Sequence, residues 1–339
     1  MAPAQSNGNP RMSPAEPEPA HKLATVFGGS GFIGRYVVGA LARRGWRVRV
    51  GVRRPHLANH LQPLGNVGQI MPVQANVRYP DSLAAACSGA DAVINLVGIL
   101  YNSGGQRFDA VHAQGAGAVA EAAREAGAKR LVQMSAIGAD PASGAHYARS
   151  KAEGEERARA AFAETIVVRP SIVFGPEDAF FNRFAAIARL SPALPLIGGG
   201  HTRFQPVYAG DVAEGIVRAM TLDEATGRTY EFGGPEVYSF RELMEFMLKT
   251  IQRRRLLVPL PWPVAKLQAA ALQVLPNPLL TMDQVELLKT DNVVSEAAVE
   301  AGTTLQGLGI APQSIEAIVP AYLGRFRRAG QFTRPGAER

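Results

Sequence analysis

The chain has only one cysteine, Cys87, so it cannot form an internal disulfide bond. Because Cys87 lies in an alanine-rich stretch, we expect it to be a small core residue and not a catalytic thiol. No grouping of histidine, cysteine and carboxylate residues has the spacing of metal ligands, so no metal site is expected. No run of about 18 uninterrupted apolar residues occurs either. The sequence therefore predicts no transmembrane helix.

Carboxylates are missing from a long stretch near the N-terminus. The sequence contains no Asp or Glu between Gly34 and Asp81, although the chain as a whole carries 29 of them against 36 Lys and Arg, a net charge of +7. Nucleic-acid binding would require these cations to be interleaved with stacking aromatic residues on a known module, and no such module is visible. We therefore expect no nucleic-acid partner. The basic surface is either solvated or faces an anionic membrane or an acidic protein.

The composition is that of an ordered globular α/β protein. Apolar residues make up 47% of the 339 residues and charged residues 19%, and this length can bury one large core and a smaller lobe. Residues 1–21 are rich in Pro and Ala, lack the apolar stretch of a signal peptide, and are expected to form a disordered tail. Residues 326–339 are expected to form a basic tail.

A glycine-rich turn joins the first apolar run, at 23–27, to an amphipathic segment that starts at residue 32. Gly28, Gly31 and Gly34 have the spacing GxxGxxG. The first glycine permits a tight turn, the second lets the backbone approach a pyrophosphate, and the third lets the helix pack closely on the sheet. The phosphate then meets the free N–H groups of the helix. Since a strand precedes the motif and a helix follows it, the sequence predicts a dinucleotide site.

The end of the second predicted strand, at 48–52, indicates which dinucleotide binds. An NAD site usually has an Asp or Glu there to hold the ribose 2′-hydroxyl. Here Arg53 and Arg54 occupy the position, and a guanidinium can bind a 2′-phosphate through its fork of donors. NADP(H) is therefore favoured over NAD(H). The alternative is that Arg53 and Arg54 are solvated charges in a segment where arginine is abundant.

Strands and helices alternate through the first half of the chain. The strand runs are almost wholly apolar, as expected when helices cover both faces of a parallel sheet. The pattern predicts a doubly wound parallel sheet in residues 22–170, to which some later segments return, and a smaller C-terminal α/β lobe in residues 171–325. The predicted strands are 23–27, 48–52, 69–73, 92–97, 130–134 and 165–169, and the predicted helices are 32–44, 81–88, 108–126 and 147–162.

Tyr147 and Lys151 are four residues apart and share one face of a predicted helix. An ammonium beside a phenol favours the phenolate, so we expect the pKa of Tyr147 to be lowered. Such a tyrosine can exchange a proton with a carbonyl group while a nicotinamide exchanges hydride. Ser135, directly after the fifth strand, could bond the same carbonyl. The alternative is a surface helix in which Tyr147 packs on the sheet and Lys151 is solvated.

Together with Asn95, these motifs resemble the extended or atypical short-chain dehydrogenase/reductase superfamily, with its Rossmann-type sheet. Longer segments resemble the nucleotide-binding accessory subunit of respiratory complex I, the alpha-subcomplex subunit nine family. The short tail and alanine-rich composition favour a bacterial homologue. The resemblance runs from about residue 22 to 325 and is carried by segments 24–38, 61–70, 93–98, 147–155, 169–178, 205–212 and 281–286.

This resemblance implies that NADPH is held as a fixed part of the fold, beside the quinone-binding region and the membrane surface, and that Arg53 faces the 2′-phosphate. The family's usual acidic residue after the third strand is Asn76 here. Ser135, Tyr147 and Lys151 are catalytic only if the protein is active. The residues expected to contact the nucleotide are Gly28, Ser30, Gly31, Phe32, Ile33, Gly34, Arg53, Arg54, Asn76, Val77, Leu96, Val97, Gly98, Tyr147, Lys151 and Pro170.

Two functions stay open at this point. One is a non-catalytic NADP(H)-binding accessory or assembly protein of complex I or of a quinone pathway. The other is an active NADP-dependent reductase or epimerase that acts on a small carbonyl or nucleotide-linked substrate. The apolar, proline-containing second half favours the first.

The second half also bears on the location of the protein. Ser239 and Glu242 predict a capping box before a helix that reaches about Arg253. Residues 264–274 are either an interfacial helix beside the basic residues 253–255 or a lid over a cleft. The first alternative predicts a peripheral protein on the cytoplasmic side of the bacterial inner membrane, or on the matrix side if mitochondrial.

Overall fold

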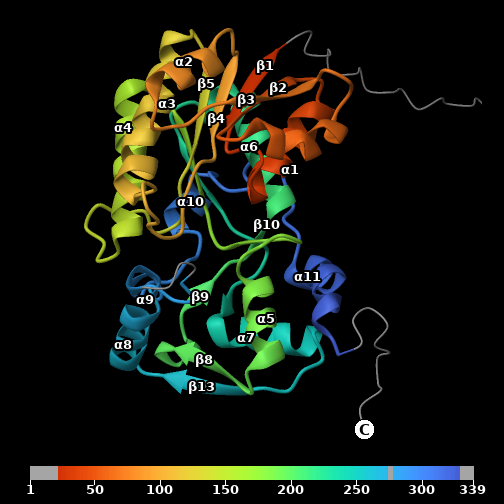
Figure 1. Cartoon of the computed structure of the whole chain (residues 1–339), viewed down its shortest axis with the longest axis vertical. Coiled ribbons are helices and arrows are strands. Elements are labelled where there is room, and N and C mark those ends of the chain that lie inside the picture. Colours follow the sequence, from red (N-terminus) through yellow and green to blue (C-terminus); the bar gives the residue numbers. More distant parts are fainter. Residues whose placement is uncertain (1–21, 274–277, 329–339) are drawn as a thin grey trace, which may run out of the picture.

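The structure is a computed structural model that describes residues 22–273 and 278–328 (Figure 1). The expected tail 1–21 and residues 329–339 of the expected basic tail lie outside the described residues. The strands are β1 (Leu23–Phe27), β2 (Arg47–Val52), β3 (Ile70–Gln74), β4 (Ala92–Asn95), β5 (Arg130–Met134), β6 (Ile166–Pro170), β7 (Val173–Phe174), β8 (Ala193–Ile197), β9 (Arg203–Phe204), β10 (Val207–Tyr208), β11 (Thr229–Phe232), β12 (Tyr238–Ser239) and β13 (Leu256–Leu260). The α-helices are α1 (Phe32–Arg43), α2 (Pro80–Cys87), α3 (Gln114–Glu125), α4 (His146–Ala161), α5 (Phe181–Leu190), α6 (Ala209–Thr221), α7 (Phe240–Thr250), α8 (Trp262–Leu272), α9 (Met282–Leu287), α10 (Glu296–Glu300) and α11 (Ile315–Leu323).

The main sheet has seven parallel strands in the order β11-β6-β5-β4-β1-β2-β3. Helices α2, α3 and α4 cover one face and α1 and α6 cover the other (Figure 1). The doubly wound sheet predicted from the apolar strand runs is therefore confirmed. The last strand, β11, comes from the second half of the chain and pairs with β6, so a later segment does return to this sheet.

Two apolar clusters bury the two faces of the sheet. One contains Val37 and Leu41 of α1 and Ile216 of α6, and the other contains Leu83 of α2 and Val119 of α3. Cys87 lies fully buried in the second cluster, and burial raises the pKa of its thiol to about 12. The prediction of a core cysteine is confirmed.

Most predicted elements differ from the observed ones by only a few residues. The predicted helix 108–126 is divided, because a π-helical turn (Asp109–Ala113) precedes α3. Residues 55–64 form a 3₁₀ helix that periodicity did not predict. The helix expected to reach Arg253 ends at Thr250, and Gln252 then adopts a φ of 53°, which a helix cannot continue through.

The C-terminal lobe has its own core, in which aromatic residues of α5 and α7 pack against β8 and α11. Its strands form short pairs, of which the parallel pair β8 and β13 is the longest. The predicted capping box at Ser239 and Glu242 is present at the start of α7. In the segment 256–280, residues 256–260 form β13 and residues 262–272 form α8. Among the described residues, no helix has both the length and the apolar character needed to cross a bilayer.

Asn292, far along the chain, joins the sheet to the C-terminal lobe. Its Oδ1 accepts hydrogen bonds from Ser171 Oγ at 2.8 Å and Ile172 N at 2.9 Å, just after β6. Its Nδ2 donates to Ile137 O at 3.2 Å, just after β5, and its backbone N donates to Arg203 O at 2.8 Å in β9. One side chain therefore fixes the loops at the carboxyl ends of two neighbouring strands.

A buried ion pair fixes α4 on the sheet. Glu155 of α4 is only 4% exposed, and its two carboxylate oxygens accept hydrogen bonds from Arg169 of β6 at 2.8 and 2.7 Å. The same guanidinium lies 4.0 Å from Glu231 of β11. Because a bidentate contact satisfies the buried carboxylate, the pair sets where α4 lies against the sheet.

Replacing Arg169 should therefore be costly. In Arg169→Leu the Glu155 carboxylate stays buried without its partner, and we expect the free energy of unfolding to fall by about 3 to 5 kcal/mol. The control is Arg157→Leu, which removes an exposed pair with Glu153 on the same helix and should cost at most about 0.5 kcal/mol. Urea unfolding measures both. If the two variants lose the same amount, the buried pair does not fix the helix.

Candidate functional site

The site lies where the order of the main sheet reverses. β1 has β2 on one side and β4 on the other, so the connections that leave these strands at their carboxyl ends diverge to opposite sides. Ligands of doubly wound sheets bind in the crevice outside these ends. Gly28 follows β1 and Leu96 follows β4, and Leu96 N donates to Phe27 O at 3.0 Å. The two loops are therefore side by side.

The three predicted glycines make close backbone contacts. Gly28 has a φ of +77°, and a Cβ on it would lie 3.2 Å from the carbonyl carbon of Leu96. A Cβ on Gly34 would lie 2.3 Å from Gly28 O, so α1 could not start this close to the turn with any other residue there. Gly31 precedes α1, and no side chain among the described residues caps the first turn. The free N–H groups in the first turn of α1 can therefore bind an anion.

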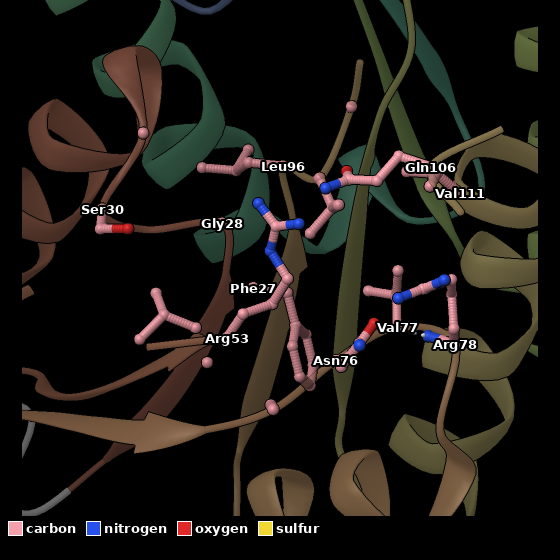
Figure 2. A pocket seen from close by; sticks show the side chains of 16 residues that line it. Phe27, Gly28, Ser30, Arg53, Asn76, Val77, Arg78, Leu96, Gln106 and Val111 are labelled. Carbon is pink, nitrogen blue, oxygen red and sulfur yellow. Dashed lines mark hydrogen bonds between the residues drawn. The ribbon is translucent and has the colours of Figure 1, made fainter. Parts of the chain in front are cut away.

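A cavity of about 260 Å³ opens beside this turn (Figure 2). Figure 2 shows the Arg53 side chain reaching into the cavity, and Asn76 and Arg78 also line it. The structure thus brings together, around one space, predicted residues from the turns after four different strands. The predicted residues that line it are Gly28, Ser30, Gly31, Arg53, Asn76, Val77, Leu96, Val97 and Gly98.

Other predicted residues lie outside the lining of this cavity. Phe32 faces Gly175, where an added Cβ would lie 3.1 Å from the Phe32 ring, and Ile33 packs on the core under α1. Gly34 lies within the first turn of α1, and Arg54 is exposed before the 3₁₀ helix. Pro170 ends β6, where its carbonyl accepts from Ile137 N at 3.0 Å.

Seven lining residues were not among the predicted contacts, and two of them, Arg78 and Gln106, are polar. Arg78 follows Asn76 after β3, and its Nη1 donates to Gly105 O at 3.0 Å. The reasoning applied to Arg53, a cation after a strand in a segment without carboxylates, would have found it. Gln106 comes from the long loop after β4, and no sequence pattern singles it out.

Tyr147 and Lys151 lie on the first turns of α4, and Lys151 is buried. Lys151 Nζ is 5.9 Å from the centre of the Tyr147 ring and donates to Met134 O at 3.3 Å. The expectation of a lowered tyrosine pKa is wrong for this arrangement. Burial raises the pKa of Tyr147 to about 12 and lowers the pKa of Lys151 to about 8. Loss of hydration disfavours the charged form of both side chains, and for Lys151 it outweighs the attraction of Glu155.

Ser135 follows β5 at the carboxyl edge of the sheet and is buried. Its backbone N donates to Val168 O at 2.7 Å, but its Oγ has no hydrogen-bond partner. Among the described residues, Ser135 Oγ is the one buried side-chain polar atom that lacks a hydrogen-bond partner. A buried hydroxyl without a partner is unfavourable in a folded protein, so this one suits a ligand atom.

His112, in the π-helical turn, was also missed. Its Nε2 accepts from Ile99 N at 3.0 Å, its Nδ1 lies 3.0 Å from Ser150 Oγ, and its ring contacts Tyr147 edge to face. Burial and the charge of Lys151 lower the pKa of His112 to about 2, so the ring is neutral. His112 therefore connects the loop after β4 to α4 by neutral hydrogen bonds.

Comparisons with known proteins agree with this geometry. The sequence profile of the NAD dependent epimerase/dehydratase family matches residues 24–233. The chain belongs to this family. The match begins at β1 and ends just after β11, so it spans the whole seven-stranded sheet.

The resemblance to the complex I subunit is confirmed. The chain is 37% identical over 320 residues to NADH dehydrogenase [ubiquinone] 1 alpha subcomplex subunit 9, mitochondrial, of Arabidopsis thaliana, which covers 91% of this chain and 79% of that protein. The Mus musculus protein of the same name is 35% identical over 308 residues, with 90% and 80% covered. A ceramide reductase of Caulobacter vibrioides is 31% identical over 297 residues, with 84% and 89% covered.

Solved structures share the fold. The crystal structure of gox2253 has a TM-score of 0.69 at 21% identity and covers 92% of this chain and 100% of that one. The structure of DesIV, a dTDP-glucose 4,6-dehydratase from Streptomyces venezuelae with NAD and TYD bound, has a TM-score of 0.67 at 20% identity, with 91% and 98% covered. At these identities the likeness shows the architecture alone.

The lowered pKa of Lys151 predicts a pH effect on stability. The folded lysine loses its proton near pH 8, whereas the unfolded one holds it until its ordinary 10.5. Between these values the unfolded state binds more protons, so the contribution of Lys151 makes unfolding harder as pH rises, by up to about 1.4 kcal/mol per pH unit. Urea unfolding at pH 8, 9 and 10 should show this increment in the wild type and not in Lys151→Met. Equal pH slopes for both proteins would rule out the perturbed lysine.

Proposed function

We propose that this protein is a non-catalytic NADP(H)-binding accessory or assembly subunit linked to NADH:ubiquinone oxidoreductase or to quinone metabolism. The observation that carries the proposal is the 37% identity, over 91% of the chain, to alpha-subcomplex subunit 9, combined with a cavity at the glycine turn. The bound nucleotide would supply binding energy that stabilises only the folded state. The residues that would hold it are those of the glycine turn, the cavity and α4.

The electrostatics of the cavity support NADP(H) over NAD(H). Arg53 and Arg78 line it, and no carboxylate does so among the described residues. Two guanidiniums offer forked donors to a 2′-phosphate, and nothing in the lining would repel that charge. Asn76, at the position where the family has an acid, uses its Oδ1 to accept from Arg78 N at 3.2 Å. The amide thereby orders the turn that presents Arg78.

Arg53→Asp tests this preference. The new carboxylate would repel a 2′-phosphate and could accept a hydrogen bond from a 2′-hydroxyl, so NADPH should bind at least about ten-fold more weakly while NADH is spared or improved. Titration of nicotinamide fluorescence gives both dissociation constants. Arg54→Asp is the control, because Arg54 lies outside the cavity. Unchanged NADPH affinity in Arg53→Asp would contradict the assignment.

The packing of Tyr147 supports a structural use of the nucleotide. A pKa raised to about 12 keeps the phenol protonated, which suits either candidate function, whereas Lys151 is directed at a backbone carbonyl. Phe108 and His112 both contact the Tyr147 ring edge to face, so the side chain is held in an aromatic cluster. A tyrosine held in this way can hydrogen-bond a nucleotide without moving a proton.

The free hydroxyl of Ser135 favours the second candidate, an active NADP-dependent reductase. Ser135, Tyr147 and Lys151 retain the residue types needed to polarise and protonate a carbonyl group, and Ser135 Oγ has no internal partner. One relative of 31% identity is named a ceramide reductase. This alternative would use hydride from the nucleotide to reduce a small, lipid or nucleotide-linked carbonyl compound.

The surface of the C-terminal lobe supports a peripheral position on a membrane or partner. In α8 the residues facing inward are Ala265 and Ala269, while Leu267, which is 75% exposed, and Val264 face outward. Leu256 of the neighbouring strand β13 is 71% exposed. Helix α8 thus packs Trp262 and its alanines on the lobe, while Val264 and Leu267 present exposed apolar surface that a membrane or a partner could cover. The described helix ends at 272, two residues before the expected end.

The expected basic cluster 253–255 gives weaker support than anticipated. Arg253 Nε donates to Phe326 O at 2.9 Å and Arg255 Nε donates to Ala188 O at 2.7 Å. Two of the three arginines therefore serve the lobe itself, and replacing them would disturb its packing. We propose that apolar contact through α8 and β13 contributes more than this cluster to location on the cytoplasmic or matrix side of the membrane.

Tyr147→Phe separates the two candidate functions. In the accessory role this variant should keep NADPH, co-migrate with NADH:ubiquinone oxidoreductase on native gels of membranes, and restore that activity to a deletion strain. In the reductase role it should lower turnover of quinones, aldehydes or ketones by roughly a hundred-fold or more. The wild-type chain is the control in both assays. A wild-type chain that is wholly soluble at low salt and co-migrates with no membrane complex would refute the accessory role.

A further inference from the structure

The N-terminus of α4 is capped by a residue from the C-terminal lobe. Ala145 precedes the helix and offers no side-chain acceptor. Instead, Oδ1 of Asp283 accepts from His146 N at 2.9 Å and Oδ2 accepts from Tyr147 N at 3.2 Å. Asp283 lies in the first turn of α9. Its carboxylate thus satisfies two end N–H groups and lies at the positive end of the helix dipole.

The helix that presents Asp283 is held close to α4. Thr281 and Gln284 form a capping box that starts α9, so Asp283 is on an ordered turn. A Cβ on Gly144, just before α4, would lie 3.0 Å from Glu286 Oε1 on the next turn of α9. Glu286 in turn lies 3.5 Å from Lys266 of α8. A chain of direct contacts therefore runs from α8 through α9 to the start of α4.

The capped turn is the one that carries the predicted nucleotide contacts. Tyr147 is the second residue of α4 and Lys151 lies one turn further. If the first turn of α4 unwinds, the Tyr147 phenol moves and the backbone that positions Lys151 is no longer held in place. The N–H groups that Asp283 satisfies are thus within one turn of both side chains.

We propose that Asp283 is a positioning residue that couples nucleotide binding to the packing of α8 and α9. The proposal rests on the nucleotide site proposed above. Linkage requires the coupling to be reciprocal: if the Asp283 contact favours the nucleotide, bound nucleotide must stabilise that contact by the same free energy. A cap that serves only the stability of the fold would show no such reciprocity.

The first measurement is the NADPH affinity of the full chain. Losing a helix cap costs about 1 kcal/mol, so Asp283→Ala should weaken NADPH binding roughly five-fold. Asp283→Asn keeps one acceptor oxygen and should recover most of the affinity. Glu300→Gln, which removes an exposed charge of α10 that is not part of this chain of contacts, should bind like the wild type. Because Asp283→Asn retains a cap, it remains informative if Asp283→Ala is poorly folded.

The second measurement is hydrogen exchange in residues 281–287. NADPH should slow this exchange in the wild type and in Glu300→Gln, and have little effect on it in Asp283→Ala. The coupling would be overturned if Asp283→Ala bound NADPH as tightly as the wild type, or if NADPH did not change the exchange rate of α9 in the wild type. Neither result would contradict the nucleotide site itself. A wild-type chain that binds neither NADPH nor NADH would instead overturn the proposed function, and the coupling with it.

Discussion

The arrangement of the site depends on the close contact between α4 and the π-helical turn beneath it. A Cβ on Gly154 would lie 2.3 Å from His112 O, so the two backbones can meet only because this residue has no side chain. The contact brings His112 against Tyr147 and lets its ring bond to both the loop after β4 and Ser150. Once α4 lies this close, the loop that lines the cavity and the Tyr147 and Lys151 pair belong to one packed unit.

Three further contacts then fix the direction of α4. Arg169 pairs with Glu155 from the sheet side, and Lys151 Nζ donates to the carbonyl of Met134. Asp283 holds the first turn from the C-terminal lobe. These contacts come from β6, β5 and α9, which are far apart in the sequence. Helix α4 therefore contacts both the sheet and the lobe, and its position depends on how the two are packed together.

The sequence predicts the sheet well because its strands are local apolar runs and its first turn is a local glycine pattern. The same holds for Arg53, whose place in the cavity lining follows from its position after one strand. Asp283, Gln106 and His112 could not be found in this way, since their importance comes from contacts between distant segments. The predicted shift of the Tyr147 pKa failed for a related reason: spacing shows that a lysine is near, but it does not show that burial removes water from both groups. The sequence also predicts surface charge at Arg253 and Arg255, whereas both donate to carbonyl groups that only the folded lobe brings near.

The single cysteine is buried, so labels for spectroscopy can be attached selectively to cysteines introduced on the surface. Cys87 is wholly enclosed beside α3, and the pKa of its thiol is raised to about 12, so its thiolate is scarce at neutral pH. A maleimide dye or spin label would therefore react at a cysteine introduced on the surface while sparing the native one. Labels placed on the outer face of α8 and on the exposed side of α4 could report the distance between the lobe and the sheet without first replacing the native cysteine.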